Sequence, residues 1–514
     1  MTPSPPAGST RLFARPAFQA GLVAFVVGVL AQWWSHRAQA VFAFWDAQAH
    51  LDIARRVVDS LTPGLQMLGT VWLPIPHLLL LPFTLVDRWW YGGLAGGIVG
   101  IVAFVAIVAA VHDLLVRRTG RPTLAWCGTA LVLFNPSLLY LQSTAMTEPV
   151  LLAFLTSAAV ALDRWNHQGD RRSLVMAGLL AALGVGSRYD GWFFVAVATL
   201  LVAWLSARAD RRWLSEAALF ALPSAVMALA WFGFNYAFFG DALEFQRGAW
   251  SAQAQQAALA ARGLLPTKGH PLLAAAYYLG AAALCSGTLV TMLGLLATPL
   301  QFRHVRRNAP ALLLLTALPF NILALWAGQS VIALPWTTPA GILNVRYGVM
   351  LLPGLAVSLT LAGAWLLDRR PEWRRGTLLA GMAVILAQGT LFTVDWPANA
   401  GALREGLAIR DGDRRQQRAS DWLAEHYDGG RVLVDGAVNI SPRTRIKLRD
   451  RIYDWTWQLG PAALAAPERE VDWVIVDSRD TTDAVSHAVA RRPEFAVRFD
   501  RAFADDGLEI WRRR

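Results

Sequence analysis

Residues 93–111 read GLAGGIVGIVAFVAIVAAV and contain no charged side chain. A helix of about 20 apolar residues crosses the hydrocarbon core of a bilayer, because each helical residue adds about 1.5 Å along the axis. The stretch therefore predicts a membrane-spanning helix. Gly92, Gly96 and Gly100 recur at every fourth position, a spacing that lets two helices pack closely within a membrane.

Apolar runs of similar length recur along most of the chain. Of its 514 residues, 55% are hydrophobic and 16% are charged, whereas charged residues make up about a quarter of a soluble domain. Comparing the runs with the thickness of a bilayer gives about eleven spans. We therefore predict an α-helical polytopic membrane protein, with spans near 17–34, 93–111, 122–141, 149–163, 173–187, 191–206, 214–236, 277–300, 309–328, 347–366 and 376–394.

The loops between these runs differ in their arginine content. By the positive-inside rule, the arginine-rich loops face the cytoplasm. Arg11 and Arg15 place the N-terminus on the same side, so an odd number of spans leaves the C-terminal segment extracytoplasmic. We therefore predict an integral plasma (inner) membrane protein, whose net charge of +11 reflects topology and not a nucleic-acid partner. The arginines of the alternate loops are Arg117, Arg118, Arg121, Arg164, Arg171, Arg172, Arg208, Arg211, Arg212, Arg303, Arg306, Arg307, Arg369, Arg370, Arg374 and Arg375.

The first apolar run has an alternative interpretation as a cleaved signal peptide. Ala38-Gln39-Ala40 resembles a cleavage site that follows an apolar stretch. The run is long for a signal peptide, however, and ends in Trp33-Trp34, a pair typical of a membrane interface. These features favour a retained span.

The composition changes near Asp395, after which charged residues are spread throughout. Residues 413–427 predict an amphipathic helix ended by Gly429-Gly430, and residues 431–435, 472–477 and 508–511 predict strands. Asp505-Asp506-Gly507 is typical of a hairpin turn. We therefore divide the chain into a transmembrane catalytic domain, residues 1–394, and a small extracytoplasmic α/β domain, residues 395–514.

Three predicted outer segments, at about 35–91, 237–276 and 329–346, are longer than simple turns. Loops of more than ~12–15 residues are usually functional or disordered, and the Trp, Pro and apolar content of these segments argues against disorder. We therefore expect the working surface on the outer side.

Two outer acids are candidates for catalysis. Asp46 follows the first span directly and shares a helix face with His50, four residues later. Glu148 lies in Thr147-Glu148-Pro149 at the next outer turn. Both have structural alternatives, because Asp is a good helix N-cap and Glu is favourable in the first turn of a helix.

Cations are expected on the same side. Arg188-Tyr189 lies at a third outer turn, Arg346-Tyr347 opens a later span, and Lys268 lies in the second long segment. An arginine at the outer edge runs against the positive-inside pattern and indicates an anionic partner. The alternatives are local pairing, contact with lipid headgroups and a solvated loop charge. Two acids and two or three cations at one outer pocket suit group transfer from a lipid phosphate.

The order of these parts resembles the GT-C superfamily of integral membrane glycosyltransferases over residues 17–366. The sequence looks most like the branch containing the protein O-mannosyltransferases and the lipid A aminoarabinose transferase. Two positions depart from that pattern, because Asp46 is followed by Ala47 instead of a second acid, and Arg188 stands where relatives often have lysine. The matching parts are Asp46, the stretch Trp72-Leu73-Pro74-Ile75-Pro76-His77-Leu78, the Gly-rich second span, Asn135-Pro136, Glu148, and Arg346-Tyr347 before Pro353.

The resemblance implies transfer of a hexosyl or pentosyl group from a polyprenyl-phosphate sugar to a hydroxyl of a glycan, lipid or protein, with inversion. Asp46 would be the general base, and Glu148 would position the acceptor or stabilise charge on the sugar. Arg188 and Arg346, with Lys268, would neutralise the departing phosphate, beside Tyr189 and Tyr347. The lipid tail would lie in a groove between spans.

His50 and His77 are further candidates for substrate binding. Together with the acids they could hold Mn or Mg. No ligand spacing here is diagnostic, and the resemblance does not require a metal, so no metal site is assigned.

Two other functions are alternatives. A transporter or flippase of lipid-linked saccharides would have inverted repeats and charges deep within its spans, and neither is evident in the sequence. A scaffold whose membrane part is only an anchor would not need eleven spans and long ordered loops.

Overall fold

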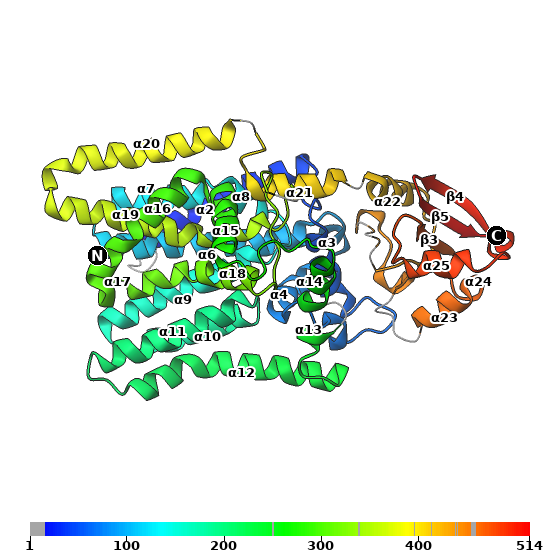
Figure 1. Cartoon of the computed structure of the whole chain (residues 1–514), viewed down its shortest axis with the longest axis horizontal. Coiled ribbons are helices and arrows are strands. Elements are labelled where there is room, and N and C mark those ends of the chain that lie inside the picture. The colour runs from blue at the N-terminus through cyan, green and yellow to red at the C-terminus, as the bar shows by residue number, and fades with distance from the viewer. Residues whose placement is uncertain are drawn as a thin grey trace, which may run out of the picture. The chain divides into compact units, whose positions relative to one another are not determined.

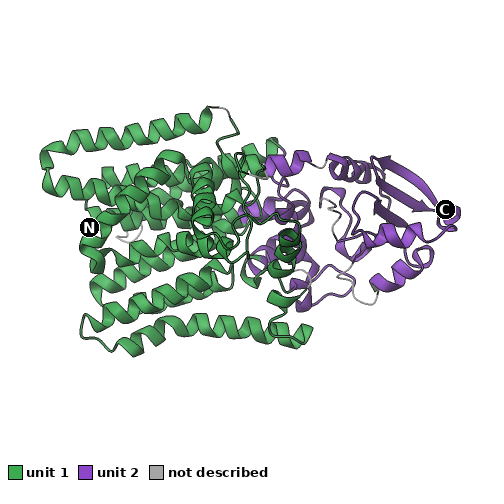
Figure 2. Cartoon of the chain, viewed as in Figure 1, with its two compact units in different colours: residues 1–38, 70–76, 99–405 green, residues 39–69, 77–98, 406–514 purple. Residues whose placement is uncertain are grey.

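The computed structural model describes residues 16–248, 251–337, 340–394, 396–412, 414–436, 438, 440, 442–453 and 459–514. It is mostly helical, as predicted, with one small sheet near the C-terminus. The chain forms two compact units, shown in Figure 2. Unit 1 comprises residues 1–38, 70–76 and 99–405, and unit 2 comprises residues 39–69, 77–98 and 406–514. Arg11, Arg15 and Asp395, which entered the predictions of topology and domain boundary, lie outside the described residues.

Unit 1 is built from helices. Of these, α10 packs against both α9 and α12, and α11 packs mainly against α12 (Figure 1). The elements with most of their residues in unit 1 are α2 (Pro16–Arg37), α6 (Leu94–Thr119), α7 (Pro122–Leu133), α8 (Pro136–Leu141), α9 (Glu148–Gln168), α10 (Arg171–Val185), α11 (Asp190–Ala207), α12 (Trp213–Phe239), α13 (Glu244–Arg247), α14 (Ala252–Ala261), α15 (Pro271–Ser286), α16 (Thr288–Ala297), η2 (Thr298–His304), α17 (Val305–Leu312), η3 (Leu313–Leu315), α18 (Ala317–Trp326), η4 (Val345–Leu351), α19 (Leu352–Arg369), η5 (Pro371–Trp373) and α20 (Arg374–Thr393).

Within the described residues, six helices are long and apolar enough to cross a membrane, and a bent pair makes up to seven. Helix α6 contains residues 94–111 of the apolar run at 93–111, which was predicted to cross the membrane. Other predicted spans are divided in the structure: residues 122–141 form α7 and α8, and residues 309–328 form α17, η3 and α18. The chain is an integral membrane protein, as predicted. The expected total of eleven spans remains a prediction.

The bent pair consists of α15 and the segment Thr288–Leu315, which begins with α16. The two parts meet at Gly287 with an angle of 117° between them. Gly287 has φ of +101°, a conformation that glycine adopts without steric cost. The side chain of Gln388, from α20, accepts a hydrogen bond from Leu289 N at 2.9 Å. This bond satisfies one of the backbone donors that the break leaves open.

A second break separates α7 from α8 at the Asn135-Pro136 pair. Asn135 Oδ1 accepts a hydrogen bond from Leu138 N at 2.9 Å and caps α8, while its Nδ2 donates to Cys285 O at 2.9 Å. The same region explains the predicted glycine spacing at one position. A methyl group on Gly100 would overlap the carbonyl oxygen of Gln142, so α6 can approach this backbone only at a glycine.

Unit 2 contains a five-stranded sheet in the order β2-β1-β3-β5-β4. Strand β1 pairs in parallel with β2 and β3, and β5 pairs antiparallel with β3 and β4. Helices α4, α6 and α21 (Gly401–Gly412) have residues in both units. The other elements of unit 2 are α3 (Trp45–Arg56), η1 (Leu65–Leu68), α4 (Pro74–Thr84), α5 (Asp87–Tyr91), α22 (Arg414–His426), β1 (Val432–Leu433), η6 (Pro442–Thr444), η7 (Leu448–Asp450), β2 (Arg451–Ile452), α23 (Leu459–Ala465), α24 (Pro467–Glu470), β3 (Trp473–Asp477), α25 (Ala484–Ala490), α26 (Phe495–Arg498), β4 (Phe499–Asp505) and β5 (Leu508–Arg513).

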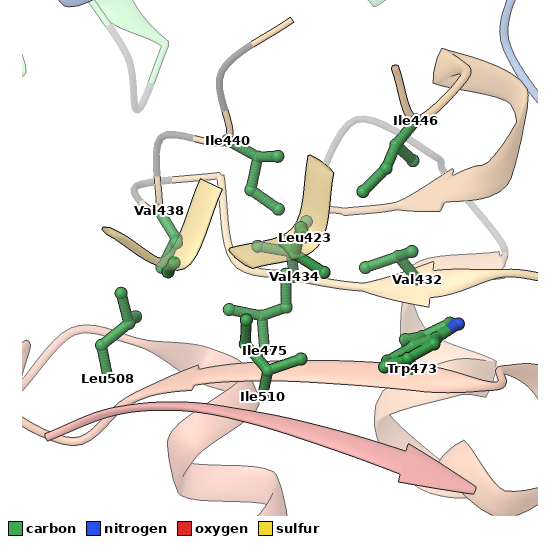
Figure 3. Packing of buried hydrophobic residues seen from close by; sticks show 11 residues of the cluster. Leu423, Val432, Val434, Val438, Ile440, Ile446, Trp473, Ile475, Leu508 and Ile510 are labelled. Atoms are coloured by element: carbon green, nitrogen blue, oxygen red, sulfur yellow. The ribbon is translucent and has the colours of Figure 1, made fainter. Parts of the chain in front are cut away.

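Both faces of the central strand β3 are buried. Trp473 and Ile475 point to one face, where Figure 3 shows them with Leu508, Ile510 and Leu423. The alternate residues of β3 pack in a second cluster on the other face. A strand that is buried on both faces forms the centre of a layered α/β domain, and this confirms the predicted α/β fold at the C-terminus.

The predicted hairpin turn joins β4 to β5. Asp506 and Gly507 have φ of +48° and +90°. Two successive positive φ values are typical of the tight turn whose twist matches that of the paired strands. The sequence therefore identified the turn.

The segment that follows α2 packs with the C-terminal sheet inside unit 2. Arg451 Nη1 lies 3.2 Å from Asp52 Oδ2, and Arg449 Nε lies 3.0 Å from Asp59 Oδ1. Lys447 forms an ion pair with Asp87. The segment of residues 39–69 is therefore held to the sheet domain by charged contacts, a feature that no local pattern predicts.

Candidate active site

Glu148 begins α9 and is completely buried. Its Oε1 accepts hydrogen bonds from Arg188 Nη1 at 3.2 Å and from Arg346 Nε at 3.3 Å. Oε2 is buried without a hydrogen-bond partner among the residues that the structure describes. The first turn of a helix favours a carboxylate, but the two guanidinium contacts show that Glu148 does more than begin the helix.

Arg188 lies in the turn between α10 and α11. Its Nη1 also donates to Thr147 Oγ1 at 3.1 Å, and its Nε donates to Asp190 Oδ2 at 3.3 Å. Burial alone would lower the pKa of Arg188, but Glu148 and Asp190 raise it above its usual value, so the guanidinium stays charged. Within the described part of the chain, Nη2 of Arg188 has no hydrogen-bond partner, which leaves donors for an anion.

Arg346 lies in η4, immediately before α19. Its Nη1 donates to Glu405 Oε1 at 2.7 Å, so its guanidinium bridges Glu148 and Glu405. The guanidinium carbons of Arg346 and Arg188 lie 5.3 and 5.1 Å from the centre of the Tyr347 ring. These distances are within the range of cation–π attraction, so Tyr347 helps to hold both arginines.

Glu405 of α21 was not predicted as part of the site. It is completely buried and accepts hydrogen bonds from Asn344 N at 2.6 Å and Arg346 N at 3.0 Å. Burial raises the pKa of Glu405, an effect that Arg346 partly offsets. The sequence signal was weak, because Glu405 lies in a helix rich in polar residues. Its spacing of three residues from buried Ala402 places it on the inner face of that helix.

Tyr189 and Lys268 are the other residues of unit 1 that were predicted to bind substrate. Tyr189 donates to Val71 O at 3.4 Å and stacks on Phe245, with 5.6 Å between ring centres. Lys268 is exposed on the turn before α15. The ion pairs of Glu148 are with Arg188 and Arg346.

A pocket of about 20 Å³ lies between the helices of unit 1. One wall carries Asp190, the partner of Arg188. The other lining residues are mainly apolar: Leu152, Leu155, Thr156, Phe194, Leu313, Leu314, Thr316, Ala317, Met350 and Pro353. The pocket therefore joins an apolar interior to the charged cluster.

Asp46, His50 and His77 belong to unit 2. Asp46 is half-buried in the first turn of α3, whose N-cap is Phe44, so the alternative that Asp46 caps the helix is wrong. His50 Nδ1 lies 2.9 Å from His77 Nε2, a hydrogen bond between the two rings. Within the described residues, no three His, Cys, Asp or Glu side chains gather to hold a metal ion, so none is assigned a metal-binding role.

Three comparisons relate this chain to known proteins. Residues 98–245 match the family described as dolichyl-phosphate-mannose-protein mannosyltransferase. This segment covers α9, α10 and α11, and so includes Glu148 and Arg188. No curated protein is similar in sequence at a significant level.

Solved structures share the fold along nearly the whole chain. ArnT from Cupriavidus metallidurans bound to undecaprenyl phosphate has a TM-score of 0.59 and 13% identity, covering 95% of this chain and 97% of ArnT. The oligosaccharyltransferase of Archaeoglobus fulgidus in complex with Zn and sulfate has a TM-score of 0.52 and 14% identity, covering 90% of this chain and 67% of that enzyme. The matched family and the shared fold confirm the predicted resemblance: this chain is an integral membrane protein with the GT-C fold.

Proposed function

We propose that this chain is a glycosyltransferase that moves a hexosyl or pentosyl group from a polyprenyl-phosphate donor to an acceptor hydroxyl. The arrangement of Arg188, Arg346 and Glu148 carries the proposal. The buried guanidinium group of Arg346 and the partly exposed one of Arg188 meet at one carboxylate, and Arg188 Nη2 has no partner among the described residues. Such a cluster has the charge and geometry to receive the phosphate of a lipid-linked sugar.

In the proposed reaction, the acceptor oxygen attacks the anomeric carbon as the bond between that carbon and the phosphate oxygen breaks. The hydroxyl proton passes to Asp46, the general base. The electron pair of the broken bond stays on the phosphate, where Arg188 and Arg346 stabilise the added negative charge. Glu148 fixes the two arginines and stabilises positive charge on the sugar. One displacement at the anomeric carbon gives inversion.

The apolar surface beside Asp190 supports a lipid-linked donor. It is formed by residues of α9, α11, η3, η4, α18 and α19. ArnT from Cupriavidus metallidurans, which shares the fold, was solved with undecaprenyl phosphate. We therefore place the phosphate at Arg188, with the lipid tail among the apolar helices of unit 1.

The topology is proposed from the distribution of arginine. The arginine-rich loops would be cytoplasmic, and residues 395–514 would form an extracytoplasmic domain. The acceptor, whether glycan, lipid or protein, would then be reached from the outer side of the inner membrane.

The test is transfer in native membranes by an Arg188→Gln variant. We expect lipid-linked sugar to accumulate and glycosylated product to fall by roughly 100-fold or more, the typical loss when a preorganised charge is removed. Arg208→Gln is the matched control, because Arg208 is exposed at the other end of α11. Normal transfer by a correctly inserted Arg188→Gln protein would reject the proposed function.

A further inference from the structure

A second pocket, of about 60 Å³, lies within unit 2 beside the first turn of α3 and the helix α22. None of its lining residues belongs to the charged cluster of unit 1. They are Gln39, Phe42, Trp45, Gln48, Arg410, Gln416, Gln417, Ser420, Asp421 and Arg443.

The lining is rich in groups that both donate and accept hydrogen bonds. Four of the side chains are amides and one is a hydroxyl, and these are accompanied by a carboxylate and two guanidinium groups. A ligand with many hydroxyl groups matches such a surface, because each hydroxyl also donates and accepts. Trp45 adds a flat apolar ring that is 42% exposed and can cover the C–H face of a sugar.

Gln48 gives an independent sign of a ligand. Its Nε2 donates to Phe42 O at 2.9 Å, which fixes the orientation of the amide. Its side chain is only 6% exposed, and Oε1 has no hydrogen-bond partner within the described ranges. A buried acceptor without a partner is unfavourable, and a ligand hydroxyl that donates to Oε1 would remove the penalty.

Other ligand classes fit the pocket less well. A lipid chain would leave the amides without partners, because it offers no hydrogen bonds. Peptides are usually bound at a strand edge or in an apolar groove, whereas this pocket is polar and formed by α3, the turn before it, α21, α22 and η6. The lining therefore favours a saccharide.

We propose that this pocket binds the acceptor, and that the acceptor is a saccharide. The inference rests on the proposed glycosyl transfer and names its acceptor class. Trp45 and Gln48 are three residues apart and share a face of α3. Asp46 lies in the same helical turn but is not one of the residues that line the pocket. A saccharide held by Trp45 and Gln48 would bind within one turn of α3 from the proposed base.

Direct binding to the full-length protein in nanodiscs tests the proposal. The probes are glucose, N-acetylglucosamine, maltotriose and chitotriose, with a Ser/Thr-containing peptide for comparison, measured by saturation-transfer NMR up to ~10 mM, which detects weak complexes. We expect a saccharide to bind, and Gln48→Met to weaken it about 3- to 10-fold, the loss of one hydrogen bond. Trp45→Ala should weaken it at least as much.

Two substitutions are matched controls, and a third is an alternative in case Gln48→Met does not fold. Gln168→Met and Trp373→Ala replace exposed residues outside the pocket and should leave binding unchanged. If Gln48→Met fails to fold, Gln417→Leu replaces a half-buried amide of the same pocket. The proposal is overturned if no saccharide binds, or if the pocket variants bind it as the wild type does. Binding of the peptide in its place, lost in the same variants, would make this a peptide site.

Transfer kinetics separate this inference from the proposed function. With the bound saccharide as acceptor, Gln417→Leu should raise KM for the acceptor about 3- to 10-fold and leave kcat within about twofold. If Arg188→Gln abolishes transfer while Gln417→Leu and Trp45→Ala leave the acceptor KM unchanged, only the acceptor inference fails. If Arg188→Gln transfers normally, the proposed function itself fails.

Discussion

Glu405 offers the sharpest test of how the charged cluster works. Its carboxylate accepts three hydrogen bonds. Two come from Arg346, one from Nη1 and one from the backbone N–H, and the third comes from the backbone N–H of Asn344. Glu405→Gln keeps the size and shape of the side chain but removes its charge. One of the two oxygens is replaced by an NH₂ group. Both oxygens accept hydrogen bonds from N–H groups, so this NH₂ group would face another donor and that hydrogen bond would be lost.

The magnitude follows from these three bonds. A hydrogen bond to a charged group contributes ~1.5–3 kcal/mol, and removing one partner of a buried ion pair costs ~3–5 kcal/mol. Arg346 keeps its contact with Glu148, so the variant does not leave its guanidinium without a charged partner. We therefore expect the lower part of the range, ~2–3 kcal/mol, or a decrease in kcat/KM of about 30- to 150-fold.

The assay is transfer from a polyprenyl-phosphate sugar by the purified protein in nanodiscs, at several donor concentrations and across pH. In the wild type, the rate should fall as the pH drops through the raised pKa of Glu405, because the protonated acid no longer anchors Arg346. Glu405→Gln should lack this acid limb. Glu425→Gln, at an exposed position of α22, is the matched control and should keep both the rate and the pH profile.

Two results would refute this reasoning. A folded Glu405→Gln protein whose kcat/KM stays within threefold of wild type would show that Arg346 needs no anchor. A large loss of activity with an unchanged acid limb would show that Glu405 matters for folding of the region and not for the charge of the cluster.

Three further predictions concern both units. Asp46→Asn should insert normally and lose transfer by ~10²–10⁴, the contribution of a general base, with lipid-linked sugar accumulating in membranes. A hydrogen bond from Lys447, opposed by burial and aided by Arg55, lowers the pKa of Asp87 below its usual 3.8. The ion pair of charged Asp87 with Lys447 and Arg55 therefore stabilises the folded protein above pH 3.8, and this stabilisation is lost as the pH falls through the lowered pKa. Asp87→Asn should therefore lower the melting temperature at pH 7, by an amount that shrinks in acid. Gly100→Ala should lower the melting temperature by several degrees because its methyl group meets a backbone carbonyl, whereas Gly233→Ala, with open space around it, should not; equal melting temperatures would contradict the close packing of α6.

Features that depend on local pattern could be predicted from the sequence. The apolar run of residues 93–111 lies within α6, because length and hydropathy alone decide whether a helix suits the bilayer. The turn at Asp506 and Gly507 was equally local, since two positive φ values select those residue types. Divisions within a run, such as the break at Gly287, depend on a side chain about a hundred residues away and were missed.

The charged cluster was predictable only in part. Arg188 and Arg346 attracted attention because arginine is unusual at an outer membrane edge, and Glu148 because it begins a helix there. Glu405 has no such signal, since a glutamate in a polar helix is usually solvated. Its role depends on contacts with Arg346 and Asn344, about sixty residues earlier in the chain.

The composition of unit 2 could not be predicted for a similar reason. The segment after the first span and the C-terminal sheet are separated by more than three hundred residues, yet Asp52 pairs with Arg451 and Asp59 with Arg449. Neither member of these pairs has a local pattern that indicates a distant partner. Opposite charges attract over any sequence separation, so only the folded chain shows which pairs form.

The pairing of the two arginines explains how a phosphate site of this kind can release its product. Three carboxylates, those of Glu148, Asp190 and Glu405, surround two guanidinium groups. The contacts of Glu148 are 3.2 and 3.3 Å long, longer than the 2.7–2.9 Å of a strong charge-assisted bond, so a phosphate can exchange with them at little cost. A bound donor is then held only moderately. The attraction grows as the phosphate gains charge during bond cleavage, which is the difference in binding that accelerates a reaction. In the proposed reaction, the carboxylates that hold Arg188 and Arg346 thus also keep the phosphate product from binding too tightly to leave.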